Sequence, residues 1–470
     1  MKSRLYITLV IGMIMLAGCQ DYLDVKPRGY DVAEKVSHYE GLLYGTETIM
    51  LDEVFPYMCF EWETNSEAYE NVYSLMGADV TNAYKWEENI FRPDENCGEW
   101  NHFAGLLYPL NVIVNGVNDA VDGTPEQKRA LYAEARVLRA YMTFMMAQFF
   151  GEPYNAEKAE TSLSVPIITK AATVGNDFTR RTMEDVYNFV VTEMTQAIPD
   201  IPIRKEHHLR AFSVTANAML GRVYWTMGDY ENAVKSLGVA IEQLSLAGCG
   251  LLDYNTMEVE GEIAYPVDDL LNPELIYNVE SMSNIWSSMY PSYYGSVLLY
   301  LKRDVLKSHY TKSDLRLCFI SGLESGVTAY KKFNNTDTYY INLSKFVGNI
   351  GITVPDLYLM YCESLARTEE YDTARTLLEE LRKTRISSDD YMVDAADGDE
   401  LIKFIVAERV REFVGYGNLW FDMRRLWDDP LFAFMKVLYT HTDGEKVYTL
   451  TEECLTMQIP PQITAWHPEY

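Results

Sequence analysis

The sequence predicts a mostly α-helical fold in which tetratricopeptide-like helical pairs form a framework and loop-rich segments form an irregular, ligand-binding face. Two helical hairpins have the spacing of a tetratricopeptide repeat, and strong start and stop signals bound the long helices. The segments 61–100 and 248–353 are rich in Tyr, Asn and Ser and have weak helical periodicity. Hydrophobic residues make up 48 % of the chain, which is enough for a large core.

The first nineteen residues have the pattern of a secretory signal. Lys2 and Arg4 precede the uncharged apolar run Leu5–Leu16, which is shorter than the roughly 20 residues of a membrane-spanning helix. The ending Leu16-Ala17-Gly18-Cys19 resembles the lipobox of bacterial lipoproteins, in which the cysteine is acylated and becomes the new N-terminus. We therefore expect a signal peptide over residues 1–18 and a lipid on Cys19; an ordinary secreted protein is the alternative.

The remaining chain divides into an N-terminal region, 19–247, and a C-terminal region, 248–470. In the first region, Phe103–Val121 has apolar residues at helical spacing. Thr124-Pro125-Glu126-Gln127 combines an N-cap, a proline at the first helical position and a capping box. The helix that starts there is expected to stop at Gly151, and the next one runs from Thr182 to Pro199.

The segment Ser213–Leu246 matches the 34-residue tetratricopeptide repeat, with Gly228-Asp229 as the turn between two helices. A second copy covers Val354–Arg385, with its turn at Glu370-Tyr371, and the helices over 103–149 are a degenerate third candidate. More than a hundred residues separate the two clear copies, so the sequence predicts a helical framework with a large insertion. Unrelated helical hairpins are the alternative interpretation.

Four further elements are expected in the C-terminal region. Leu275–Glu280 has the composition of a strand, and Val297–Tyr310 has helical periodicity. Helices are also expected at Glu400–Phe413 and Trp420–Trp427, and the tail around Gln458–Gln462 is expected to be extended.

Charge excludes some partners. The formal net charge is −29, and the part after the signal has 38 basic and 69 acidic residues. Such a surface repels nucleic acid and anionic lipid, and it suits neutral or cationic ligands. Six cysteines remain after Cys19, with neither zinc spacing nor the density of a disulfide scaffold, which leaves open whether Cys59 and Cys97 pair.

Aromatic residues make up 13 % of the chain, and they indicate a binding chemistry. Flat rings bind the apolar face of a pyranose while neighbouring polar groups pair with its hydroxyls. The candidates in the loop-rich segments are Trp86, Trp100 with Asn101, Trp286 and Tyr293. The alternative for each is a role in packing, which is the interpretation we give to Trp225, Trp420 and Trp427.

No catalytic or metal-binding pattern is present. The sequence lacks a His-Glu-x-x-His motif, a phosphate loop and a Gly-x-Ser-x-Gly elbow. The acidic residues between Asp394 and Glu400 do not follow EF-hand spacing, and they fit a solvated helix start. We therefore expect no catalytic residues, no metal and no cofactor.

Five stretches in order along the chain are similar to the SusD/RagB family of surface lipoproteins. They are Cys19 with Asp21-Tyr22-Leu23-Asp24 and Pro27; Glu134–Arg136 with Leu138–Tyr141, Phe144 and Phe150-Gly151; Tyr358–Tyr361 with Glu363 and Ala366; Glu408-Arg409 with Glu412, Gly417, Trp420–Met423 and Arg425; and Ile459-Pro460 with Pro468. Two departures are local. The usual Glu-Gly-x-Arg is Tyr416-Gly417-Asn418-Leu419 here, and His467 replaces the usual Asn before the terminal proline.

The resemblance implies a non-enzymatic protein that sits over a SusC-type TonB-dependent outer-membrane transporter and passes it an oligosaccharide. It also implies attachment to the outer membrane through the lipid anchor, and Gln20, in place of an aspartate, agrees with that sorting. Two alternatives remain. One is the same architecture carrying peptides or another nutrient, and the other is a lipoprotein that hydrolyses glycans or peptides.

Overall fold

The structure is a computed structural model, and it describes most of the chain. The described residues are 33–44, 54–64, 78–95, 97–172, 176–203, 210–259, 262–263, 274–277, 300–302, 304–305, 309–322, 339–341, 351–468 and 470. The predicted signal peptide and Cys19 lie outside them.

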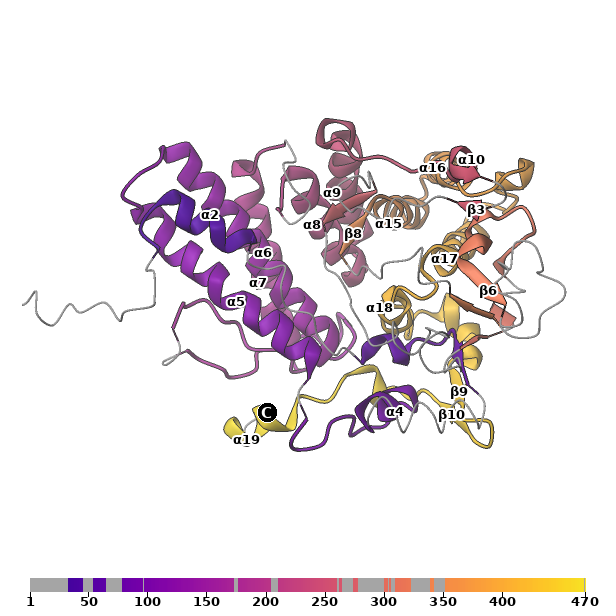
Figure 1. The fold of residues 1–470 in the computed structure, drawn as a ribbon, viewed down its shortest axis with the longest axis horizontal. Coiled ribbons are helices and arrows are strands. Elements are labelled where there is room, and N and C mark those ends of the chain that lie inside the picture. Colours follow the sequence, from indigo (N-terminus) through magenta and orange to yellow (C-terminus); the bar gives the residue numbers. More distant parts are fainter. Residues whose placement is uncertain are drawn as a thin grey trace, which may run out of the picture.

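Helices dominate the described residues, and they form two adjoining groups (Figure 1). The α-helices are α2 Val36–Tyr44, α4 Ala78–Tyr84, α5 Gly98–Gly116, α6 Pro125–Phe150, α7 Met183–Ala197, α8 Ser213–Met227, α9 Tyr230–Gln243, α10 Tyr254–Met257, α15 Val354–Arg367, α16 Tyr371–Lys383, α17 Asp399–Phe413, α18 Asn418–Arg425 and α19 Pro461–Trp466. The 3₁₀ helices are η3 Phe55–Met58, η4 Val117–Asp119, η5 Ile198–Asp200, η6 Ser245–Ala247, η8 Leu315–Phe319, η10 Asp389–Tyr391, η11 Pro430–Leu438 and η12 Glu453–Leu455.

Local signals place the first group of helices, α5 to α7, as the sequence predicts. The Thr124 side chain accepts a hydrogen bond from the Gln127 backbone, and the Gln127 side chain accepts one from the Thr124 backbone, which closes the predicted capping box. Helix α6 ends at Phe150, immediately before Gly151, and Thr182 caps α7. Because α6 is buried along most of its length, it is the central element of this group.

Both predicted repeat hairpins are present as α8–α9 and α15–α16. Gly228 adopts φ 74° at the end of α8, a left-handed conformation that favours glycine, and Asp229 caps α9. Helix α15 packs against α9, so the two hairpins are neighbours in space although more than a hundred residues separate them in the chain (Figure 1). The insertion therefore leaves the helical framework continuous.

The close approach of α8 and α9 depends on Gly221. A Cβ atom at this position would lie 2.4 Å from Leu237 Cδ2 and 2.5 Å from its Cγ. We expect Gly221→Ala to lower the free energy of unfolding by about 1–3 kcal/mol, as overpacking does in a filled core. The matched control is Gly41→Ala in α2, where nothing lies within 4 Å, and a gain of about 0.5–1 kcal/mol is expected. Urea unfolding of both variants checks the prediction, and equal effects would contradict it.

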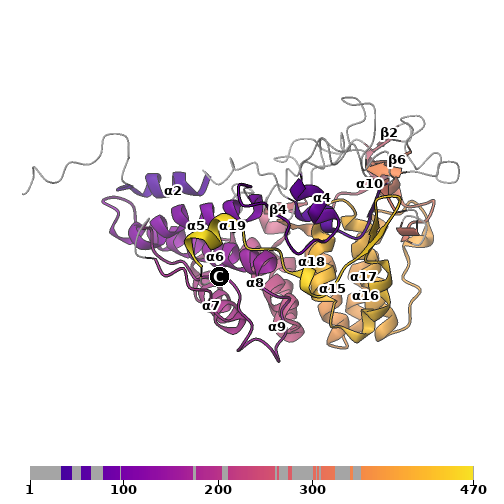
Figure 2. The same ribbon diagram turned by 90° about the horizontal axis from the view of Figure 1, so that it is seen from below.

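The strands are short; β4 and β8 pair beside α8 near the centre of the molecule, and β3, β6, β9 and β10 lie toward one end (Figure 1). They are β1 Trp62–Glu63, β2 Glu258–Val259, β3 Glu262–Ile263, β4 Leu275–Tyr277, β5 Tyr300–Leu301, β6 Ile320–Gly322, β7 Tyr339–Ile341, β8 Ile352–Thr353, β9 Thr440–Thr442 and β10 Val447–Thr449. Four of them form an antiparallel sheet in the order β1-β5-β7-β6, and β9 pairs with β10 in a hairpin. Figure 2 shows α4, β2 and β6 along one margin, with α9, α16 and α17 on the opposite side.

Two sequence predictions hold only in part in this region. The segment Val297–Tyr310 was expected to be helical, and its described residues 304–305 and 309 are, but Tyr300–Leu301 form β5, in which Leu301 pairs with Trp62 of β1 and with Tyr339 of β7. Pairing with distant strands overrides the local periodicity. The expected extended tail is also shorter than predicted, because Pro461 occupies the first position of α19, where proline favours a helix.

Two further findings concern cysteines and membrane-spanning helices. Cys59 and Cys97 are buried free thiols, so they do not form a bridge with each other. Within the described ranges, the search for a helix of sufficient length and apolar character to cross a membrane finds no candidate.

Candidate functional site: a polar cleft above a buried ionic framework

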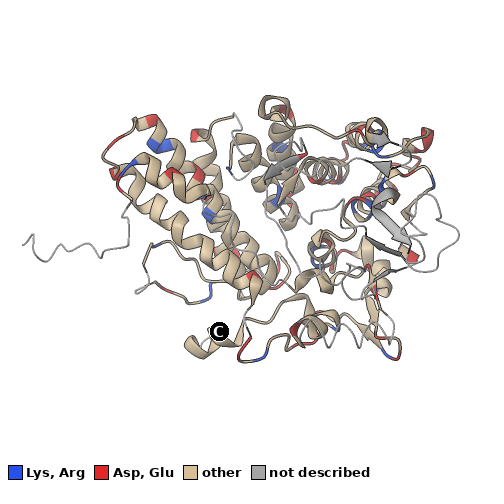
Figure 3. Cartoon of the chain, viewed as in Figure 1, with Lys and Arg blue, Asp and Glu red and all other residues tan. Residues whose placement is uncertain are grey.

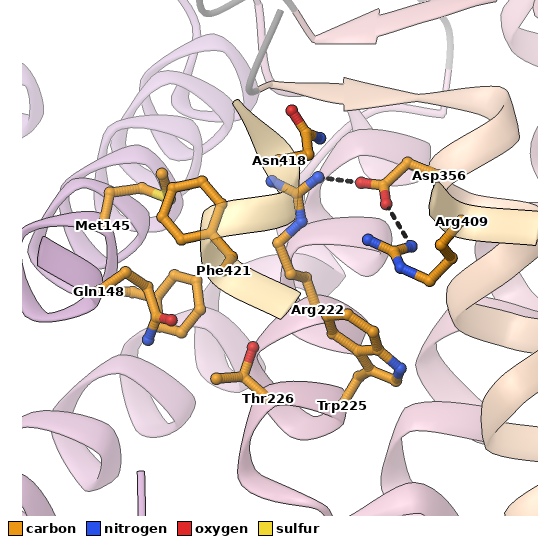
Figure 4. Close-up of a pocket in the computed structure, with 10 residues that line it drawn as sticks. Met145, Gln148, Arg222, Trp225, Thr226, Asp356, Arg409, Asn418 and Phe421 are labelled. Atoms are coloured by element: carbon orange, nitrogen blue, oxygen red, sulfur yellow. Dashed lines mark hydrogen bonds and ion pairs between the residues drawn. The ribbon is translucent and has the colours of Figure 1, made fainter. Parts of the chain in front are cut away.

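A chain of buried ion pairs joins the repeat hairpins to α17 and α18. Asp356 of α15 accepts from Arg409 of α17 at 2.9 Å and also pairs with Arg222 of α8. Arg409 Nε in turn donates to both oxygens of Asp422 at 3.1 Å. All four side chains are almost completely removed from solvent, and Figure 4 shows the three that meet at the Asp356 carboxylate.

The framework continues through Trp225. Its indole Nε1 donates to Glu363 at 3.1 Å, and its ring lies 4.7 Å from the Arg409 guanidinium and 3.7 Å from that of Arg425. Arg425 completes this series of ion pairs by donating to both oxygens of Glu363, at 2.9 and 3.0 Å. The sequence interpretation of Trp225 as a framework residue is therefore confirmed.

Paired arginines keep the buried carboxylates ionised. Burial alone raises the pKa of Asp356, but Arg222 and Arg409 outweigh it and hold that pKa below its ordinary value. Burial likewise raises the pKa of Glu363, and Arg425 outweighs it and holds the pKa low. Acidic and basic residues occur together along α15 to α18 (Figure 3), so this part of an acidic protein is internally neutralised.

A small cavity lies inside this framework, and it is too small for a nutrient. Its volume is about 20 Å³, which accommodates about one water molecule. Asn418 Oδ1 at its wall is buried and has no hydrogen-bond partner in the described part of the chain, so a water bound there would satisfy it. The lining residues are Phe144, Met145, Gln148, Arg222, Trp225, Thr226, Asp356, Arg409, Asn418 and Phe421 (Figure 4).

A larger and more open cleft lies where β1 and β5 meet the β9–β10 hairpin. Its volume is about 260 Å³. Two carboxylates, an ammonium and two threonine hydroxyls line it, and Val447 supplies an apolar wall. The lining residues are Glu63, Lys302, Asp304, Thr440, His441, Thr442 and Val447. This density of hydrogen-bonding groups suits a ligand with many hydroxyls or with a positive charge.

Aromatic stacking holds His441, which lines the cleft. The His441 ring stacks against Trp86, with centroids 3.9 Å apart, and against Tyr84 at 4.3 Å. Its Nδ1 lies 2.5 Å from the Tyr84 carbonyl and its Nε2 lies 2.9 Å from the Cys59 carbonyl. Burial, followed by the charge of Lys302, lowers the pKa of His441 to about 3, and the contacts of its ring fix β9 against α4.

Lys302 lines the cleft, and the buried Glu61, immediately before β1, is its neighbour. The Lys302 ammonium donates to the Leu438 carbonyl at 3.0 Å and to the Thr440 carbonyl, and burial lowers its pKa to about 8. Glu61 pairs through its backbone carbonyl with the Lys302 N–H at 2.8 Å. Glu61 is fully buried, burial raises its pKa to about 7, and its Oε2 has no hydrogen-bond partner among the residues that the structure describes. Titratable groups in this state are typical of functional sites.

The structure corrects two of the predicted binding residues. Trp86 is only 3 % exposed, and its indole donates to the Met58 carbonyl at 2.8 Å while one ring face covers His441. Trp100 is 7 % exposed and lies edge-on to Phe150 at 4.9 Å. Both indoles therefore pack inside the protein, because aromatic residues of the loop-rich segments also form the core under this face.

The other predicted binding residues have different outcomes. Asn101 is exposed at the start of α5, and its binding role stays a prediction. Trp286 and Tyr293 lie outside the described residues, and their roles also stay predictions.

The cleft residues were not predicted from the sequence, since Glu63, Lys302 and Thr440 come from three distant segments.

The described residues contain no arrangement of three or more His, Cys, Asp or Glu side chains that could hold a metal ion.

Two family models match this chain. The first, described as "Starch-binding associating with outer membrane", matches residues 21–225, and the second, described as "SusD family", matches residues 325–459. A SusD-like protein P38 from Formosa agariphila is 22 % identical over 89 % of this chain and 90 % of its own length.

Solved structures show the same fold. A SusD superfamily protein from Bacteroides vulgatus superposes with a TM-score of 0.70 and 16 % identity, over 93 % of this chain and 98 % of its own. A SusD-like carbohydrate binding protein from the same species superposes with a TM-score of 0.61 and 14 % identity, over 83 % of each chain. With the two family models matching in order along most of the sequence, the chain belongs to the SusD/RagB family.

Proposed function

We propose that this protein is a non-catalytic, lipid-anchored lipoprotein of the outer membrane that binds oligosaccharides and delivers them to a SusC-type TonB-dependent transporter. The observation that carries the proposal is the 260 Å³ cleft, whose lining combines carboxylate, hydroxyl and ammonium groups. Sugar hydroxyls pair with such groups in both the donor and the acceptor sense. The family description of starch binding and the carbohydrate-binding title of a structural neighbour support the ligand class.

Acylation of Cys19 and exposure on the cell surface belong to the same proposal. The lipobox-like sequence Leu16–Cys19 supports the anchor, and the outer-membrane description of the family supports the location. Mass spectrometry of the N-terminal peptide after expression in a Gram-negative host should find an acylated Cys19. An unmodified N-terminal cysteine would contradict the anchor and leave the proposed ligand class to its own test.

A second candidate ligand is a cationic peptide. Glu63 and Asp304 in the cleft, together with the net charge of −29, favour it. Calorimetry with neutral oligosaccharides and with lysine-rich peptides separates the two, and binding of peptides alone would replace the first candidate with the second.

The cleft itself is tested by the double variant Glu63→Ala, Asp304→Ala. Each carboxylate that pairs with ligand is worth about 1.5–3 kcal/mol, so we expect the dissociation constant for an oligosaccharide to rise at least about tenfold. The matched control is Glu157→Ala, Glu160→Ala, which removes two exposed carboxylates from the loop after α6. Equal affinities for both double variants would exclude the cleft as the binding site.

A further inference from the structure

Trp466 is an unusual tryptophan for this protein. It is 84 % exposed at the end of α19, whereas the six other tryptophans that the structure describes are buried or half-buried. Exposing an indole forgoes the burial of a large apolar ring, whose area is about 150–250 Å². The exposed indole is therefore accessible to a ligand.

The segment that carries Trp466 is firmly held on its other side. Ile463 packs against the core, and the His467 backbone donates to the Ile463 carbonyl at 2.9 Å. The His467 ring lies 4.9 Å from Phe178 and stacks on Tyr470 at 5.3 Å, and the Tyr470 ring lies 6.4 Å from Trp100. These contacts hold the backbone of the segment while the Trp466 ring points outward. Binding a ligand would therefore cost little conformational entropy of the protein.

A polar group accompanies the exposed ring. Gln462 is exposed and precedes Trp466 by four residues in α19, so the two side chains are neighbours on one helix face. Its amide supplies both a donor and an acceptor beside the indole. A flat ring with an adjacent amide matches a pyranose, which offers an apolar face and flanking hydroxyls.

We propose that Trp466 and Gln462 form a second carbohydrate contact, outside the cleft, in which a pyranose stacks on the indole. This inference rests on the proposed function. A protein partner fits the feature less well, because a stable interface buries roughly 1,200–2,000 Å² around several apolar anchors. Trp466 is the one large apolar side chain that α19 exposes.

The position of α19 suits a long ligand. Figure 1 shows α19, α4 and the β9–β10 hairpin in sequence along the lower edge of the molecule. The cleft lies at the hairpin end of this edge, and Trp466 lies at the other. In this proposal, an oligosaccharide that occupies both sites follows this edge of the molecule.

The test uses the full chain and three probes: maltohexaose, cellohexaose and mannohexaose. Calorimetry is run on wild type, Trp466→Ala, Trp466→Phe and the control Tyr108→Ala, which removes another exposed aromatic residue, on α5. We expect Trp466→Ala to weaken the binding of a hexasaccharide about tenfold, and both Trp466→Phe and Tyr108→Ala to stay within about twofold of wild type. Because Trp466 is exposed, its loss should leave the melting temperature unchanged.

A direct readout accompanies the affinities. In a chain labelled with 5-fluorotryptophan, the ¹⁹F resonance that disappears in Trp466→Phe should shift when the bound probe is added to wild type. An unmoved resonance, together with equal affinities of Trp466→Ala and wild type, would overturn this inference. The proposed function would still stand if the double variant Glu63→Ala, Asp304→Ala binds the hexasaccharide more weakly than wild type does. If wild type binds none of the three hexasaccharides, both this inference and the proposed function are overturned for these glycans.

Discussion

Replacing Arg409 with alanine should lower the free energy of unfolding by about 3–5 kcal/mol, the largest effect we expect of any single substitution. Arg409 neutralises Asp356 and Asp422, and its removal leaves both carboxylates buried with fewer partners. It also removes the guanidinium that lies over the Trp225 ring. The loss should be visible in urea unfolding as a lower midpoint with an unchanged slope.

The control for Arg409 is an exposed pair of the same chemistry. Arg129 and Glu126 lie on α6 with side chains 55 % and 71 % exposed. Because such surface pairs contribute little, Arg129→Ala should change the unfolding free energy by less than about 1 kcal/mol. Similar losses in Arg409→Ala and Arg129→Ala would show that the buried ionic framework does not hold the helices together.

The second large effect concerns pH, and it arises from Glu61. The folded protein raises the pKa of this carboxyl from about 4.5 to about 7 by burial. Between these values the folded state keeps a proton that the unfolded state releases, so stability falls as the pH rises through the window. The total is about 3 kcal/mol, at 1.36 kcal/mol for each pKa unit.

Lys302 acts in the opposite direction at higher pH. Burial lowers its pKa from 10.5 to about 8, so between these values the unfolded state holds the extra proton and stability rises with pH. The contributions of the two groups together predict a stability minimum between about pH 7 and pH 8.

Glu61→Gln should remove the downward slope, because the amide has no proton to lose. We expect the variant to match wild type near pH 4.5 and to exceed it by about 2–3 kcal/mol at pH 8. The exposed Glu160→Gln is the control and should retain the wild-type slope. Chemical unfolding at five pH values measures all three proteins, and an unchanged slope in Glu61→Gln would show that this carboxyl is ionised throughout.

Local sequence signals predicted the helical framework well. The capping box at Thr124 and the turn at Gly228 are properties of a few consecutive residues, and both are found where the sequence places them. The repeat hairpins followed from the spacing of small and apolar residues, since that spacing alone decides which helix faces can approach closely.

The cleft could not be predicted in this way, because tertiary contacts over long sequence separations create it. His441 covers Trp86 and bonds to the Tyr84 carbonyl across 357 positions of the chain, and Lys302 reaches Leu438 across 136. A composition rich in Trp and Tyr indicates a binding face, but it does not say which rings point inward. Trp86 was therefore a reasonable candidate that proved to be core, whereas the exposed Trp466 was not among the candidates.

The central claim is that this protein binds glycans and leaves them intact, and one experiment measures both halves. The purified full chain is titrated with the oligosaccharide panel in a calorimeter, and the contents of each cell are then separated by chromatography after prolonged incubation. We expect a saturable heat with at least one glycan and recovery of that glycan at its original length. Absence of binding across a broad panel, or the release of shorter products, would contradict the claim.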